Sequence, residues 1–256
     1  MAAPPLLNGK ALGRHMRLLE MKWLFATFAF VFGCSHAAAP GEGKAPSPGS
    51  RDGEPQTFSP TSGAVYVGCG YLVAENHGAT NFTVLLLAKK AQQVPNRDYA
   101  AWVLDGVLVE TTVASANEMA SPRLRGDALL RKYLEWEAQD LAKKPGWASM
   151  QKPVVGNIDL GVPFPSLTWI ADATGDVEVL GQKIAHLLYV TAAIDDIVFV
   201  MASPLRSRDE LGVVGPSLQR ILRTLKKTSR PTDIYSLSAE IRGSKVPWKG
   251  CGPSGI

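Results

Sequence analysis

The histidines and the adjacent carboxylates are the side chains of this sequence that could do acid–base or metal chemistry. His77 and His186 are the two histidines of the probable folded region. His186 lies in an apolar, strand-like segment, which favours a structural histidine over a ligand or base. His77 belongs to a turn, where solvation explains it. Asp195 and Asp196 are neighbours that point in different directions, so they suit a turn better than an acid/base pair.

The other carboxylates and the familiar motifs add no catalytic signature. Glu135-Trp136-Glu137 is expected to alternate between the solvent side of a helix and its flank. The sequence has no H-E-x-x-H, no C-x-x-C, no glycine-rich phosphate loop with lysine and no G-x-S-x-G. It therefore predicts no enzyme, no catalytic residue, no metal site and no cofactor. A site assembled from distant residues stays open, because triads are recognised by geometry.

Positive charge concentrates near the C-terminus. Between Arg206 and Lys249 there are ten lysines and arginines and four acidic residues, whereas the whole chain carries a formal charge of +4, too modest to suggest a nucleic-acid partner. A solvated helix face with cations near its C-terminus explains the cluster. The sharper interpretation is contact with anionic lipid headgroups or an acidic envelope partner. The cations assigned to this contact are Arg220, Arg223, Lys226 and Lys227.

An apolar segment near the N-terminus indicates where the protein resides. Lys22 precedes a largely apolar run from Trp23 to Phe32. Ten residues span about 15 Å as a helix, half of the roughly 30 Å that a bilayer core requires. A run this short after a positive charge is typical of an export signal, here residues 1–33. The residues before Lys22 fit a compact signal poorly, so Met16 or Met21 is expected to be the true start.

The end of this segment, Val31-Phe32-Gly33-Cys34, resembles the lipobox of bacterial lipoproteins. In that family the cysteine is diacylated and becomes the mature N-terminus. The resemblance implies lipidation of Cys34 and an anchored protein of the cell envelope. Because Ser35 and not aspartate follows, it implies the outer membrane, facing the periplasm. The alternatives are an ordinary cleaved signal within residues 35–38, giving a periplasmic or secreted protein, and an uncleaved anchor.

The residues that follow fit an exported protein. Residues 34–60 are rich in proline, glycine and serine, which predicts a flexible tether. If Cys34 is lipidated, Cys69 and Cys251 remain as an even pair in an oxidising compartment, where they could form a disulfide. The alternative is two separate thiols.

Residues 61–227 are expected to form a single domain, followed by a polar tail at 228–256. Asp105-Gly106 between two apolar runs predicts a β-hairpin. A second hairpin is predicted from Ile184 to Ser203. Glycines on both sides of Cys69 suggest a bulge or a close backbone approach.

Two segments have the period of amphipathic helices. From Asp127, a plausible N-cap, to Lys144, apolar residues follow the helical spacing and Glu137 alone interrupts the apolar side. Leu211–Leu225 is the second helix, with either a kink at Gly215-Pro216 or a start at Pro216. In the tail, Ile234–Ile241 is the one segment expected to add an edge strand.

Hairpins without regular β–α–β alternation indicate an α+β fold, an antiparallel sheet with two amphipathic helices packed on it. This order of elements, from Val65 to Lys227, resembles the PsbP-like family, which shares its fold with a Ran-binding nuclear import factor and a bacterial envelope lipoprotein. The resemblance implies helices wrapped around an antiparallel sheet. It also implies binding to partners and not catalysis.

These features predict a non-catalytic, lipid-anchored cell-envelope protein that acts as an interaction or accessory module. Its partners would be the membrane, through N-terminal acyl groups, and an envelope protein, but no nucleic acid. The alternative class is an exported enzyme or small-ligand-binding protein with an unrecognised site. A deep pocket that gathers His186, Tyr189 or acidic side chains would favour that class.

Overall fold

The computed structural model describes residues 55–59, 62–94, 100–147, 154–156, 163–179, 181–243 and 251. The predicted export signal, Cys34 and most of the predicted tether lie outside these residues and stay predictions. The described elements all belong to one compact unit, Ala45–Ile256. None of the helices described is both long and apolar enough to cross a bilayer.

The described strands form two antiparallel sheets, a small one in the order β1-β2-β3-β4-β12 and a large one in the order β5-β6-β7-β11-β10-β9-β8. This confirms the α+β class, with the strands divided between two sheets and with three helices. The small sheet contains β1 (Pro55–Ser59), β2 (Ser62–Tyr66), β3 (Gly70–His77), β4 (Thr80–Leu87) and β12 (Lys226–Thr228). The large sheet contains β5 (Ala91–Gln93), β6 (Ala100–Leu104), β7 (Val107–Ser115), β8 (Val154–Gly156), β9 (Ser166–Val179), β10 (Gln182–Ile194) and β11 (Ile197–Leu205). The helices are α1 (Gly126–Leu141), α2 (Leu211–Leu222), α3 (Ile234–Gly243) and the short 3-10 helix η1 (Arg208–Glu210).

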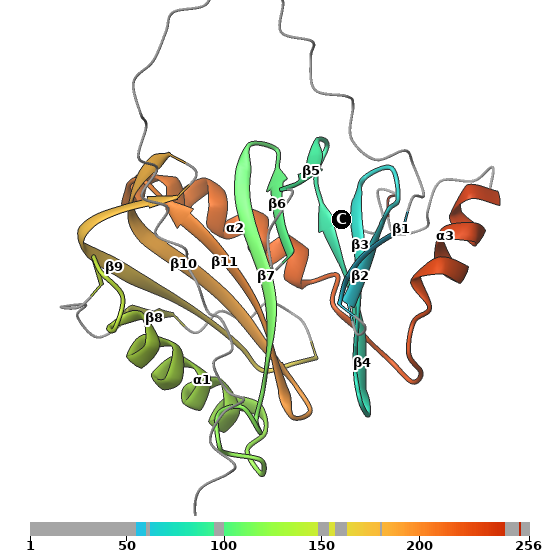
Figure 1. The fold of residues 1–256 in the computed structure, drawn as a ribbon, viewed down its shortest axis with the longest axis horizontal. Helices are drawn as coiled ribbons and strands as arrows, with labels where there is room; N and C mark the ends of the chain where they lie inside the picture. The colour runs from blue at the N-terminus through green and yellow to red at the C-terminus, as the bar shows by residue number, and fades with distance from the viewer. Residues whose placement is uncertain are drawn as a thin grey trace, which may run out of the picture. The chain divides into compact units, whose positions relative to one another are not determined.

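The elements are stacked as layers, with α1 on the large sheet, the small sheet on its other face and α3 outermost (Figure 1). The main core lies between the two sheets. Helix α2 contacts β4, β10 and β11, and its side chains Val214, Leu218 and Ile221 join that core. A smaller core lies between the small sheet and α3.

Strand β10 is apolar along almost its whole length because both of its faces are covered. Leu188, Val190 and the alternate residues after them belong to the core between the sheets. Leu187 and Tyr189, which alternate with them, are also buried, on the face that α1 covers. This two-sided burial explains the continuous apolar run that predicted the second hairpin.

The two predicted hairpins are confirmed, and each has a two-residue turn. Leu104 pairs with Val107 across Asp105-Gly106, where both residues have positive φ. Such turns match the twist of antiparallel strands. Ile194 pairs with Ile197 across Asp195-Asp196. The strand before the second hairpin, β9, ends at Val179.

The glycine after Cys69 marks a close approach of two backbones, as the sequence suggested. Gly70 has φ of 146°, and a Cβ atom there would collide with the carbonyl group of Leu86 on β4. Only glycine therefore fits at the start of β3. The turn after this strand is Gly78–Ala79, so Asn76 and His77 end the strand and do not form the turn.

Helix α1 is confirmed, but its N-cap is not Asp127. The helix begins at Gly126 and Arg125 is the cap residue, without a side-chain hydrogen bond. Asp127 lies in the first turn, where its charge favours the positive end of the helix dipole. The helix ends at Leu141, and Gly146 beyond it accepts hydrogen bonds from the β9 backbone at Thr174.

Helix α2 runs through Pro216, so it does not begin there. Proline removes one N–H, whose partner would be the carbonyl group of Gly212 on the exposed side of the first turn. Gly212 is exposed, so water can hydrogen-bond to that carbonyl group. Ser217 donates its hydroxyl proton to the neighbouring carbonyl oxygen of Val213 at 2.9 Å.

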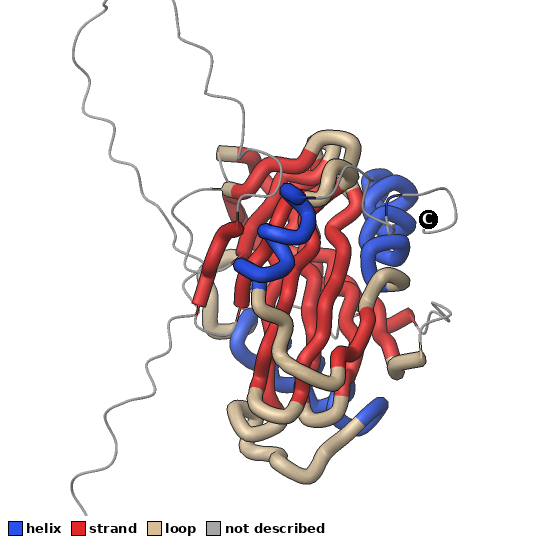
Figure 2. The backbone as a smooth tube through the Cα atoms, turned by 90° about the vertical axis from the view of Figure 1, so that its right-hand side faces the viewer, coloured by secondary structure: helices blue, strands red, loops and turns tan. Residues whose placement is uncertain are grey.

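The predicted edge strand at Ile234–Ile241 is wrong, because this segment is helix α3, which lies over β1 and β2 (Figure 2). Asp233 accepts hydrogen bonds from the N–H of Tyr235 at 3.0 Å and from the Ser236 hydroxyl, which caps the helix. Ile234, Leu237 and Ile241 have the helical spacing and face the small sheet. The polar tail therefore contributes to the fold.

The predicted tether is also too long, since β1 lies inside residues 34–60 and pairs with β2. Backbone pairing needs no apolar side chains, which is why the composition of Pro55–Ser59 did not indicate a strand.

Candidate functional site

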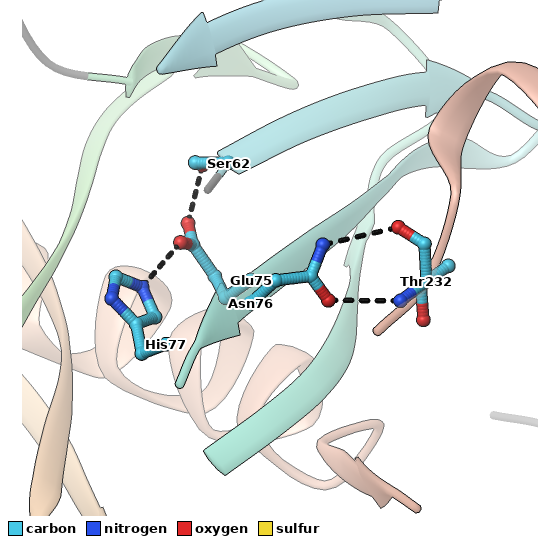
Figure 3. Close-up of polar contacts among 5 residues, drawn as sticks. All are labelled: Ser62, Glu75, Asn76, His77 and Thr232. Atoms are coloured by element: carbon cyan, nitrogen blue, oxygen red, sulfur yellow. Dashed lines mark hydrogen bonds and ion pairs between the residues drawn. The ribbon is translucent and has the colours of Figure 1, made fainter. Parts of the chain in front are cut away.

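His77 takes part in a small polar network at the end of β3 (Figure 3). Its Nε2 lies 2.9 Å from Oε2 of Glu75, and the hydroxyl group of Ser62 donates to Oε1 of Glu75 at 2.6 Å. Glu75 is only 5% exposed, so its carboxylate oxygens need these hydrogen-bond partners. The prediction that solvation explains His77 is therefore incomplete, because half-buried His77 contacts a buried carboxylate.

The order of groups in this network differs from that of a nucleophilic triad. In a triad the histidine lies between the hydroxyl group and the carboxylate and takes the hydroxyl proton. Here the carboxylate of Glu75 lies in the middle, and Ser62 and His77 bind different oxygens of it. The network is therefore arranged to hold β2 and β3 together and not to activate Ser62.

Asn76 fastens the segment before α3 to the small sheet. Its side chain donates to the carbonyl oxygen of Thr232 at 3.1 Å and accepts from the Thr232 N–H at 2.8 Å (Figure 3). We expect Asn76→Ala to lower the free energy of unfolding by about 1 to 3 kcal/mol, because both backbone groups lose their partner. Denaturant unfolding measures this, with Asn117→Ala in an exposed turn as control. An equal, small effect of both variants would contradict the prediction.

His186 lies in an ion-pair cluster between strands and η1, in agreement with a structural role. Its Nδ1 lies 2.7 Å from Oδ1 of Asp172 on β9, and the guanidinium group of Arg208 donates to the other oxygen at 2.8 Å. Burial acts to raise the pKa of Asp172, but the hydrogen bonds from His186 and Arg208 prevail and lower it. The cluster fixes η1, and with it the start of α2, on the large sheet.

Asp195 and Asp196 form the turn between β10 and β11, and they connect the two sheets. Both carboxylates lie within hydrogen-bond distance of the Thr80 hydroxyl group, at 3.2 and 3.0 Å. Lys227 of β12 forms an ion pair with Asp195, its Nζ lying 2.8 Å from Oδ1. The hydrogen bond to Lys227 lowers the pKa of Asp195. The turn role expected from the sequence therefore includes a contact between sheets.

The sequence suggested that Glu137 lies at the flank of α1. In the structure its side chain is instead buried between α1 and the large sheet, with 2% exposure. Its carboxylate accepts hydrogen bonds from the hydroxyl groups of Tyr189, at 3.1 Å, and Tyr133, at 3.4 Å. Tyr189 stacks on Trp169, with ring centres 3.8 Å apart. The sequence held the signal for this site, because Glu137 occupies a position on the apolar side of the helix.

The surroundings of Glu137 shift the titration of all three polar groups. Burial raises the pKa of Glu137, and this effect exceeds those of Lys144 and of the tyrosine hydroxyl groups, which lower it. Burial, followed by the nearby carboxylate, also raises the pKa of Tyr133 and of Tyr189 well above the usual value. Substrate cannot reach these groups, so the cluster is suited to holding α1 in place.

Cys69 and Cys251 form a disulfide, with their Cα atoms 5.6 Å apart and a separation of 182 positions in the sequence. The disulfide borders the core between the small sheet and α3. It therefore covalently closes almost the whole described fold into one loop.

A groove of about 470 Å³ lies beside the first turn of α2. Its volume is within the range of small-ligand sites. Neither His186 nor Tyr189 is among its lining residues, and the ion pair between Arg206 and Glu210 lies at its edge. The apolar lining comes from Val103, Val107, Leu108, Val179, Ile184, Pro204, Val213 and Val214.

The four predicted anion-contact residues are all exposed, but they belong to two different elements, α2 with the residue that follows it and β12. Arg220 lies on α2 and Arg223 follows its last residue. Lys226 and Lys227 are neighbours on β12, so their side chains leave opposite faces of the small sheet. Lys227 binds Asp195, and Arg220, Arg223 and Lys226 are exposed. The exposed basic residues at the end of α2 and on β12 are the candidate functional site.

Among the residues described, no three or more His, Cys, Asp or Glu side chains come together as a metal site would require. No protein-family model, curated protein or solved structure matches this chain.

Proposed function

We propose that this protein is a non-catalytic cell-envelope lipoprotein, anchored by acyl groups on Cys34, whose domain acts as an interaction or accessory module. The observation that carries the proposal is the disulfide between Cys69 and Cys251. Disulfides persist in oxidising compartments and are rare in the cytosol. The disulfide thus supports export, which the apolar segment after Lys22 predicts independently.

The polar clusters of the domain also support a binding role. Glu75, Glu137 and Asp172 each hold other parts of the fold together through the contacts described above. The basic residues near the end of α2 are exposed at the surface of the domain. A partner that binds this surface would need negative charge, and binding would require no catalytic group in this domain.

Intact-mass analysis of the membrane fraction tests this proposal. We expect a mature N-terminus at Cys34 with added acyl mass, and a further gain of two hydrogens when the disulfide is reduced. Cys34→Ala should lose the acyl mass, and Cys69→Ser combined with Cys251→Ser should keep it. An unmodified, full-length chain in the soluble fraction would refute the proposal.

The groove beside α2 supports a second candidate, an exported small-ligand-binding protein. Its volume and apolar lining suit a small apolar ligand. Val213→Trp would fill the groove from the exposed side of α2, whereas Val213→Thr changes its lining only slightly. A ligand that stabilises the wild-type protein and Val213→Thr, but not Val213→Trp, in a thermal-shift screen would favour this candidate.

A further inference from the structure

The segment from the start of α2 to the start of α3 has a one-sided charge. Residues 211–232 contain five basic residues and no acidic residue. All five are exposed. Lys227 is committed to Asp195 of the β10–β11 turn, which binds the small sheet to the large one. The basic residues at the outer surface are Arg220, Arg223, Lys226 and Arg230.

The solvent face of α2 also carries exposed apolar side chains, near the start of the helix. Val213 is 68% exposed, more than any other large hydrophobic side chain in the described part of the chain. Val213 and Arg220 are seven residues apart, so they lie on the same side of the helix at a separation of about 10 Å along its axis. Pro216 between them is also exposed. One face of the helix therefore presents apolar groups first and cations afterwards.

We propose that this face of α2, together with exposed Lys226 on β12 just beyond the helix, docks on an anionic lipid bilayer. Val213, Pro216, Arg220, Arg223 and Lys226 are called the α2 surface. The basic groups would contact the headgroups, and Val213 would enter the boundary between headgroups and acyl chains. The inference rests on the proposed function, because an acyl anchor on Cys34 would keep the domain close to such a surface.

A bilayer fits the α2 surface better than an acidic protein does. A specific protein partner would need pockets that hold Arg220 and Arg223, and its interface would be built around an apolar centre rich in aromatic side chains. The α2 surface carries no aromatic side chain, and Val213 is its one large exposed apolar residue. A fluid array of headgroups can adapt to these charges without a complementary shape.

Vesicle co-sedimentation of residues 45–256 tests the proposal without the anchor. This segment is a compact unit by itself and contains every described element, but it lacks Cys34. The probe is vesicles of phosphatidylglycerol mixed with phosphatidylcholine, compared with phosphatidylcholine alone, at low and high salt. We expect binding to the anionic vesicles alone, and weaker binding as salt screens the charges.

Two matched variants locate the contact. Arg220→Gln, Arg223→Gln and Lys226→Gln together should weaken binding by about 100-fold, because each basic residue at an anionic surface contributes roughly fivefold. Lys89→Gln, Lys90→Gln and Arg131→Gln together remove the same charge from other exposed positions and should change binding by less than about threefold. Val213→Ser should weaken binding by a factor that salt does not change, since its contribution is apolar.

Three results would overturn the proposal: no binding of the wild-type protein to anionic vesicles at low salt, an equal loss in both triple variants, or equal binding to the neutral vesicles. Circular dichroism of each variant verifies that the fold is intact. Because the protein tested lacks Cys34, these results do not depend on lipidation. The mass analysis of the membrane fraction likewise does not depend on the α2 surface, so each proposal can fail separately.

Discussion

Glu137→Ala is expected to lower the free energy of unfolding by about 3 to 5 kcal/mol, because two buried hydroxyl groups lose their acceptor at about 1 to 3 kcal/mol each and a cavity is left. Tyr133 and Tyr189 donate to this carboxylate from α1 and from β10. Denaturant unfolding measures the loss. Glu135→Ala, exposed on the same helix, should change stability by less than about 0.5 kcal/mol. Equal effects of the two variants would contradict the proposed role of the cluster.

Glu137→Gln is expected to change how stability depends on pH. Burial raises the pKa of Glu137 in the folded protein, so the folded state binds more protons than the unfolded state above the ordinary carboxyl pKa of about 4.3. The contribution of this group to stability is therefore largest at low pH and is lost as pH rises through the folded pKa. The glutamine variant lacks this loss, so its stability relative to the wild-type protein should improve as pH rises.

The pH effect of Glu137 must be separated from that of other carboxyl groups. Asp172 and Asp195 have lowered pKa values, so their contribution to stability is lost as pH falls. Lys144, Asp140 and Glu110 also act electrostatically on the cluster. Comparing Glu137→Gln with Glu135→Gln at each pH between about 4 and 8 cancels these shared contributions. A difference between the two variants that does not vary with pH would exclude a raised pKa at Glu137.

Removal of the disulfide by Cys69→Ser and Cys251→Ser together is expected to destabilise the protein by up to about 4 to 5 kcal/mol. The disulfide joins cysteines 182 positions apart in the sequence, so the reduced chain gains a large conformational entropy when it unfolds. Residues 45–256 are the suitable protein for this measurement, because they contain these two cysteines and not Cys34. The reduced wild-type protein should show the same loss as the double variant.

The effect should be greatest at α3. Only Ile234 and Ser238 of this helix are buried, and Leu237 and Ile241 are half-buried, so little apolar surface holds it on the small sheet. Amide hydrogen exchange should become faster in α3 after reduction while β10 keeps its protection. Unchanged stability and unchanged exchange in α3 would show that the disulfide contributes nothing to holding this layer.

The sequence by itself determined the elements whose signal is local. Asp105-Gly106 identified a hairpin because tight turns need positive φ, and the apolar spacing identified α1 and α2 because one side of each helix must be buried. The hairpins then indicated antiparallel strands and the α+β class. The sequence also indicated the candidate basic residues, because charged side chains are nearly always exposed.

The tertiary structure decided what depends on contacts between distant residues. The apolar pattern of β10 shows that both faces are covered, but not that α1 covers one and the small sheet the other. Glu137 is buried because Tyr189, far away in the sequence, supplies a hydroxyl group, and Lys227 is removed from the candidate surface because Asp195 binds it. Pairing of Cys69 with Cys251 likewise required both cysteines to meet beside α3. Local spacing fixes which side of an element is apolar, whereas the partner of that side is set by packing of the whole chain.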